Sequence, residues 1–176
     1  MKILRLLVLS FVFLFLMVTA ISLLMPSHVR ISRATDIQAS AGEVWRYVDD
    51  LHSWKEWNPF FSGLAPGDIE YSDTSSAEPP AIKIKETLIQ LKEIKKDERI
   101  FVMLTKGKDP VINGWKFISH SGNDSATLQW YIDLDLRWYP WEKFAGLLFE
   151  KSYGAQIEQG LSNLKKIVEK SRTSFN

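Results

Sequence analysis

The side chains that most often carry metal or acid–base chemistry are few in this sequence and do not cluster. Three histidines, His28, His52 and His120, lie far apart along the chain, and no two of them have the spacing of metal ligands. The chain has no cysteine, which excludes disulfides, thiol nucleophiles and cysteine-based zinc or iron sites. No glycine-rich phosphate loop or nucleophile elbow is present. We therefore expect no metal site and no cofactor, and nucleophilic catalysis is disfavoured.

Acidic residues on predicted strands are the candidates for a general acid. Asp133 and Asp135 alternate with apolar residues, so they face water if the apolar residues face the interior. Glu86 instead shares strand parity with Ile82 and Ile84. If that face points inward, burial would raise the pKa of the Glu86 carboxyl and make it a possible catalytic acid. The opposite face of this strand is just as apolar, so the orientation of Glu86 stays open.

Aromatic residues offer a different chemistry, the binding of an apolar molecule. The chain has 7 tryptophans and 10 phenylalanines. Alternate residues of a strand share one face, and in several predicted strands that face carries large apolar side chains. The predicted ligand-binding residues, with two from the segment before the strands, are Trp57, Phe60, Phe101, Met103, Trp115, Phe117, Trp130 and Ile132. A solid core filled by the same residues is the alternative, and the sequence does not separate the two.

The N-terminal segment has the composition of a membrane anchor. Leu6 to Met25 is apolar apart from three hydroxyl residues, and roughly twenty such residues span a bilayer as a helix. A cleaved signal peptide is the alternative, because Val18 to Ala20 offers small residues for cleavage. The apolar run continues beyond the usual length of such a signal, however. We predict a single-pass anchor over residues 1–28, with the following domain extracytoplasmic.

Residues 29–172 predict one α+β domain, followed by a tail of residues 173–176. Ser40 stands three residues before Glu43, the spacing of a capping box, so a helix should begin there. A second short helical segment is expected over 51–57. Short polar turns between the strands indicate antiparallel neighbours. The predicted strands cover 29–37, 69–72, 82–91, 99–105, 114–119 and 127–136.

A long amphipathic helix is predicted over 141–170. Its apolar face is formed by residues spaced by four, three and four, namely Ile157, Leu161, Leu164 and Val168. Gly154 and Gly160 each cost about 1 kcal/mol relative to alanine inside a helix, so a structural reason is expected for both. We predict a break near Gly154 and close packing against the sheet at Gly160.

The order of these elements resembles the START-like (SRPBCC) superfamily, and within it the membrane-anchored bacterial type of the polyketide cyclase/dehydrase family. The residues that carry the resemblance are Ile37, Val44, Trp45, Asp50, Trp54, Trp57 and Pro59 at the front, and Gly154, Glu158, Gly160, Leu161, Asn163, Leu164 and Lys165 at the back. The resemblance covers essentially the whole domain after the anchor. It implies a helix-grip fold, in which a curved antiparallel sheet wraps around a long C-terminal helix. It also implies a deep cavity for lipids, isoprenoids, polyketides or other apolar molecules.

The leading functional prediction is a membrane-anchored domain that binds a lipid or other apolar small molecule without catalysis. One alternative is a cyclase or hydrolase that acts on an apolar substrate in the same cavity. Another is an interaction module whose core is filled. The formal net charge is +1, so nothing in the composition indicates a nucleic-acid partner. The expected partners are the apolar ligand and the membrane, and a monomer is expected.

Overall fold

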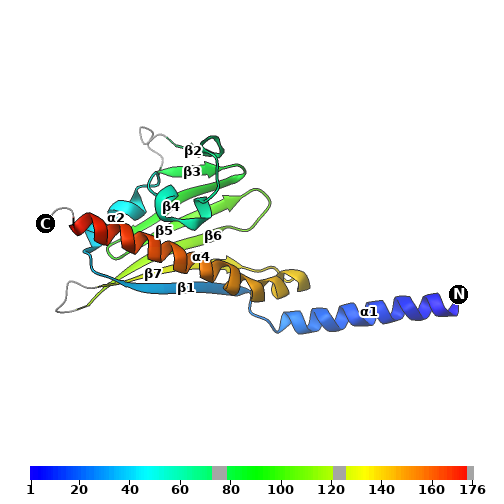
Figure 1. The fold of residues 1–176 in the computed structure, drawn as a ribbon. Coiled ribbons are helices and arrows are strands. Elements are labelled where there is room, and N and C mark those ends of the chain that lie inside the picture. The colour runs from blue at the N-terminus through cyan, green and yellow to red at the C-terminus, as the bar shows by residue number, and fades with distance from the viewer. Residues whose placement is uncertain (73–78, 121–125, 174–176) are drawn as a thin grey trace.

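A curved antiparallel sheet forms the body of the protein in the computed structural model, which describes residues 1–72, 79–120 and 126–173 (Figure 1). Its described strands follow the order β1-β7-β6-β5-β4-β3-β2, and every neighbouring pair is antiparallel. The α+β helix-grip prediction is confirmed. The strands are β1 (His28–Ile37), β2 (Ile69–Tyr71), β3 (Ala81–Ile84), β4 (Thr87–Lys95), β5 (Glu98–Thr105), β6 (Val111–Ser119) and β7 (Ala126–Asp135). Most of the polar turn expected between the strands predicted over 114–119 and 127–136 lies outside the described residues.

Four short helical segments connect β1 to β2. They are α2 (Ala41–Asp49), α3 (Trp54–Trp57), η1 (Pro59–Phe61) and η2 (Pro66–Asp68). The predicted capping box starts α2: the Glu43 amide donates to Ser40 Oγ (3.4 Å), and the Ser40 amide donates to Glu43 Oε2 (2.7 Å). Asn58 ends α3 and starts η1, because its Oδ1 accepts a hydrogen bond from the Phe60 amide (3.1 Å). These caps place α3 and η1 over the sheet.

The single strand predicted over 82–91 is wrong, because the chain reverses in the middle of it. Ile84 pairs with Thr87 across a two-residue turn, in which Lys85 has a φ of 54°. Neither turn residue is glycine or asparagine, so the sequence carries no turn signal, and the alternating apolar residues of β3 and β4 resemble a single continuous strand. Glu86 consequently lies exposed in a turn. The buried catalytic acid considered for this position does not exist.

Helix α4 (Pro140–Thr173) crosses one face of the sheet without interruption (Figure 1). The predicted break at Gly154 is wrong. The guanidinium of Arg33, from β1, lies against Gly154 and forms ion pairs with Glu150 (2.7 Å) and Glu158 (2.6 Å) on either side of it. A side chain at position 154 would displace this guanidinium, which explains the glycine. Residues 174–176 of the predicted tail lie outside the described residues.

The C-terminal half of α4 and the concave face of the sheet enclose the core. The predicted apolar stripe of α4, from Ile157 to Val168, is fully buried. Close packing at Gly160 is also confirmed, because a Cβ at that position would overlap the Trp130 ring. Aromatic rings pack beneath α3, with Trp115 stacked on Trp130 at a centroid distance of 5.1 Å and Trp54 edge-on to Phe101 at 4.9 Å.

Helix α1 (Lys2–Leu23) extends away from the domain, and its apolar side chains are exposed along most of its length (Figure 1). With 22 residues it is about 33 Å long, close to the thickness of a bilayer's hydrocarbon core. Within the described ranges it is the one helix long and apolar enough to cross a membrane. The finding rests on length and composition, which a signal sequence also satisfies.

Candidate functional site

A cavity of about 210 Å³ lies between the concave face of the sheet, the α3–η1 segment and α4. Its walls are mostly aromatic and aliphatic, and a few polar groups lie among them. The lining residues are Trp54, Asn58, Phe60 and Phe61 from the α3–η1 segment, Ile89, Met103, Thr105, Val111, Asn113, Trp115, Trp130 and Ile132 from the sheet, Lys108 from the β5–β6 turn, and Tyr153 from α4. Such a composition is typical of sites for apolar small molecules.

Five of the predicted ligand-binding residues line this cavity: Phe60, Met103, Trp115, Trp130 and Ile132. Their contact with a ligand remains a prediction.

The other three predicted residues are buried in the core beside the cavity and do not line it. Trp57 packs edge-on against Trp115 and Trp130, with centroid distances of 6.3 and 5.8 Å. Phe101 lies against Trp54, and Phe117 lies 6.2 Å from the Trp45 ring of α2. Strand parity therefore identifies the concave face, but the helix that covers each position decides whether it belongs to the core or to the cavity.

Several lining residues were missed in the sequence, although strand parity could have identified some of them. Strand β6 begins at Val111 rather than at the predicted Gly114, so Val111 and Asn113 continue the inward face that Trp115 marks. Thr105 continues the parity of Met103 in the same way. Tyr153 also had a signal, because it lies one helical turn before Ile157 and continues the apolar stripe of α4.

Polar groups on the wall are only partly paired. The buried Asn113 side chain donates from Nδ2 to Met103 Sδ (2.6 Å) and accepts from Trp130 Nε1 at Oδ1 (3.3 Å). The indole N–H groups of Trp57 and Trp115 are buried and have no hydrogen-bond partner among the described residues. A buried donor without a partner costs about 1–3 kcal/mol. Trp115 lines the cavity, so its N–H is a candidate donor to a ligand oxygen.

Titratable groups in the described lining are limited to Lys108 and Tyr153, with no carboxylate and no histidine. Nor do the described residues contain a group of three His, Cys, Asp or Glu side chains that could hold a metal. The predicted outward orientation of Asp133 and Asp135 agrees with their positions: Arg30 binds Asp133 (2.6 Å), and Asp135 is exposed.

Among the described residues, the largest pKa shift lies on the opposite, outer face of the sheet. Burial, together with the hydrogen bond that the Tyr131 hydroxyl donates to Glu98 (2.9 Å), raises the pKa of Tyr131 to about 12. Tyr131 faces away from the cavity because neighbouring strand residues alternate, and Trp130 and Ile132 point inward. Perturbed groups often mark active sites, but this one belongs to the outer surface.

The C-terminal sequence pattern secures the cavity wall. Asn163 Nδ2 donates to the Trp57 carbonyl (3.1 Å), which attaches α4 to the end of α3. Glu158 binds Arg33 of β1 (2.6 Å). Gly160 allows the Trp130 ring to lie against the helix. These residues of the pattern therefore position α4 over the cavity and do not line it themselves.

Comparison with known proteins agrees with this architecture. A family model described as polyketide cyclase / dehydrase and lipid transport matches residues 28–169. No curated protein matches the chain.

Solved structures with similar folds include a START superfamily protein from Mycobacterium smegmatis, with a TM-score of 0.57, 16% identity, and coverage of 80% of this chain and 97% of that one. A norcoclaurine synthase from Thalictrum has a TM-score of 0.58 and 13% identity, with 82% of this chain matching 96% of that one. The di-domain ARO/CYC StfQ of the steffimycin biosynthetic pathway has a TM-score of 0.62 and 11% identity, with 83% of this chain matching 52% of that one. At such identities these likenesses show the fold alone.

Proposed function

The chain belongs to the polyketide cyclase / dehydrase and lipid transport family, and from this we propose that it is a membrane-anchored protein that binds an apolar small molecule without catalysis. The observation that carries the proposal is the cavity beneath α3 and α4. Its described lining is predominantly aromatic and aliphatic and includes no acid or histidine. An apolar wall with few polar groups supports binding and orientation of a ligand better than proton transfer.

The size of the cavity indicates how much of a ligand it holds. An apolar cavity of about 150 Å³ accepts benzene, whereas pockets for drug-sized ligands span about 300–1,000 Å³. At about 210 Å³ the cavity suits one ring system or the end of a chain. A groove of about 320 Å³ continues from it, because Lys108, Val111 and Tyr153 line both. A longer molecule would therefore place one end in the cavity and the remainder in the groove.

The polar groups favour a ligand with an oxygen acceptor. Trp115 presents a buried N–H that has no partner within the described part of the chain, and Lys108 supplies a cation where the cavity meets the groove. A carbonyl, hydroxyl or carboxylate oxygen on an otherwise apolar molecule would satisfy such donors. The proposed ligand class is accordingly a lipid-like or polycyclic molecule that carries one polar end.

The membrane enters the proposal through α1. We infer that it crosses the bilayer once, with Lys2 and Arg5 on the cytoplasmic side and the domain outside. Apolar molecules partition into bilayers, so a tether of this kind would keep the binding domain beside its ligand pool.

A second candidate function, a cyclase-type reaction on an apolar substrate, is favoured by one observation. Lys108 and Tyr153 both line the cavity, and a lysine–tyrosine pair can exchange a proton with a substrate oxygen. Incubation of a co-purified compound with Lys108→Met and Tyr153→Phe variants separates the two functions. A reaction would convert the compound with the wild type and slow with the variants, whereas a binder returns it unchanged.

The proposal is tested by identifying what the protein carries. The full chain, extracted in detergent, should release an apolar compound on denaturation that mass spectrometry detects in near-stoichiometric amount. An Ile132→Trp variant is the control, because the larger side chain would occupy the cavity. The same compound at the same amount from both proteins would indicate adventitious detergent or lipid and would contradict binding in the cavity.

A further inference from the structure

The first turns of α4 and the two residues before them expose an unusual amount of apolar surface. From β1 onward the described part of the chain has seven large hydrophobic residues that are exposed, and five of them lie between positions 138 and 148. These five, defined here as the α4 apolar face, are Trp138 (57% exposed), Trp141 (62%), Phe144 (40%), Leu147 (65%) and Leu148 (69%). Contiguous apolar surface of this kind marks an interaction site.

The face has the pattern of an interfacial helix. Trp141, Phe144, Leu147 and Leu148 follow one another at spacings of three, three and one, so they lie on one side of α4. Tyr139 stacks on Trp141 at a centroid distance of 5.0 Å, which extends the aromatic part of this surface. Tryptophan and tyrosine are enriched where proteins meet the headgroup region of a bilayer.

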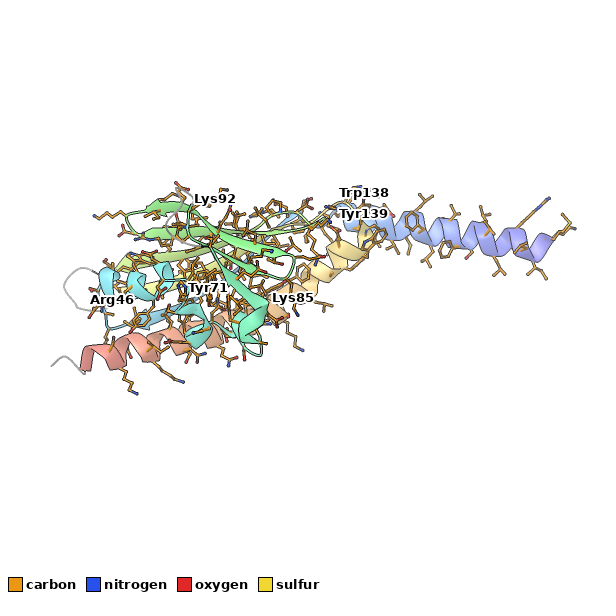
Figure 2. The ribbon with its side chains drawn as sticks, turned by 90° about the horizontal axis from the view of Figure 1, so that it is seen from above. Arg46, Tyr71, Lys85, Lys92, Trp138 and Tyr139 are labelled. Atoms are coloured by element: carbon orange, nitrogen blue, oxygen red, sulfur yellow. The ribbon has the colours of Figure 1, made fainter. Side chains whose placement is uncertain are left out.

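The flank of the same turns is fixed to the linker that follows α1. The buried Lys143 Nζ donates to Ser27 Oγ (2.6 Å) and to the Met25 carbonyl (3.3 Å). The Leu136 amide donates to the Ser27 carbonyl (2.6 Å), which attaches the end of β7 to the same linker. The α4 apolar face is therefore held at the end of the domain from which α1 leaves. Figure 2 shows Trp138 and Tyr139 beside that junction.

We propose that the α4 apolar face lies in the headgroup region of the same bilayer that α1 crosses. The proposal rests on the anchor function proposed above and adds a second, independent contact between the domain and the membrane. Its occupant is a lipid surface, because the face is continuous with the point where the apolar helix ends. The groove that leads to the cavity lies on the adjacent side of α4, lined by Ala145, Phe149 and Tyr153. Docking would thus place the groove beside the lipid.

Single-cysteine fluorescent labels test this arrangement, because the natural chain has no cysteine. The full chain is reconstituted in phosphatidylcholine vesicles that contain spin-labelled lipid quenchers. An NBD label is placed at Leu147→Cys on the face, at Lys166→Cys on the exposed far part of α4 as the matched control, and at Phe13→Cys within α1. We expect blue-shifted emission at position 147 and quenching about threefold stronger than at position 166.

The labels separate the two proposals. Equal, weak quenching at positions 147 and 166, with strong quenching at position 13, would overturn docking and leave the anchor intact. Weak quenching at all three positions would overturn both. Blue-shifted emission at position 147 without lipid quenching, accompanied by disulfide-linked dimers of unlabelled Leu147→Cys, would show that a second copy covers the face and would also overturn the proposal.

Discussion

Gly160→Ala should destabilise the protein, although alanine is the better helix former. An added Cβ would lie 3.0 Å from Pro59 Cδ and 3.3 Å from Trp130 Cη2, and closer still to Trp130 Cζ3. Carbon atoms prefer separations of about 3.5–4.0 Å, so the Trp130 ring has to move. Overpacking of this kind costs about 1–3 kcal/mol, against a gain of about 1 kcal/mol in helix propensity. The expected net change in the free energy of unfolding is a loss of up to about 2 kcal/mol.

The displaced ring also predicts an effect on ligand binding. Trp130 lines the cavity, so the space available to a ligand should shrink by about one methyl group. Exclusion of one methylene from an apolar site costs about 0.8 kcal/mol, which corresponds to about fourfold weaker binding.

Urea unfolding followed by tryptophan fluorescence measures the stability change, and Gly42→Ala is the matched control. Gly42 lies in α2, where an added Cβ would meet nothing within 4 Å, so alanine there should stabilise the protein by up to about 1 kcal/mol. If Gly160→Ala raised the urea midpoint as much as Gly42→Ala does, the helix would not be pressed against Trp130. The account of the cavity wall would then be refuted.

Three further outcomes follow from the same structure. Gly114→Val should lower the stability by about 1–3 kcal/mol in urea unfolding, because the Tyr131 ring covers Gly114; an unchanged midpoint would refute that packing. Since folding raises the pKa of Tyr131 from 10.0 to about 12, its contribution to stability is complete below pH 10 and should be lost as the pH rises towards 12. Tyr131→Phe should remove that part of the alkaline loss, and identical pH profiles for both proteins would contradict it. Lys143→Met should speed hydrogen exchange near Ser27 by about tenfold, as expected for the loss of a charged hydrogen bond, whereas unchanged exchange would show that Lys143 does not hold the linker.

The fold could be predicted because its signals are local and periodic. Alternation along β5 and β7, the capping box at Ser40 and the stripe from Ile157 to Val168 each follow from the repeat of a strand or a helix. The turn at Lys85 was not predicted, because a residue other than glycine or asparagine adopts a positive φ there. A tertiary contact accounts for Gly154, since the side chain that occupies its space, Arg33, is about 120 residues away in the sequence, on β1.

The sequence allowed us to predict which residues lie on the concave face of the sheet, but not which of them line the cavity. Parity placed Trp115, Phe117 and Trp130 on the same concave surface. Whether α2, α3 or the cavity lies above each of them depends on packing between distant segments, which strand periodicity does not encode. Helical periodicity could have identified Tyr153, which lies one turn before Ile157 on the same face of α4. Lys108 reaches the cavity from a turn without a periodic signal, so its role required the three-dimensional arrangement.

The most direct test of the central claim is a binding titration of the full chain with apolar acids of increasing chain length, followed by tryptophan fluorescence. Trp54, Trp115 and Trp130 line the cavity and should report its occupation. Binding in the cavity predicts saturable fluorescence changes whose affinity rises with chain length, by up to about 0.8 kcal/mol per buried methylene, until the cavity and groove are full. Ile132→Trp should abolish the length dependence. Absence of a saturable response across the series, or an identical response from Ile132→Trp, would contradict the claim that the cavity binds an apolar ligand.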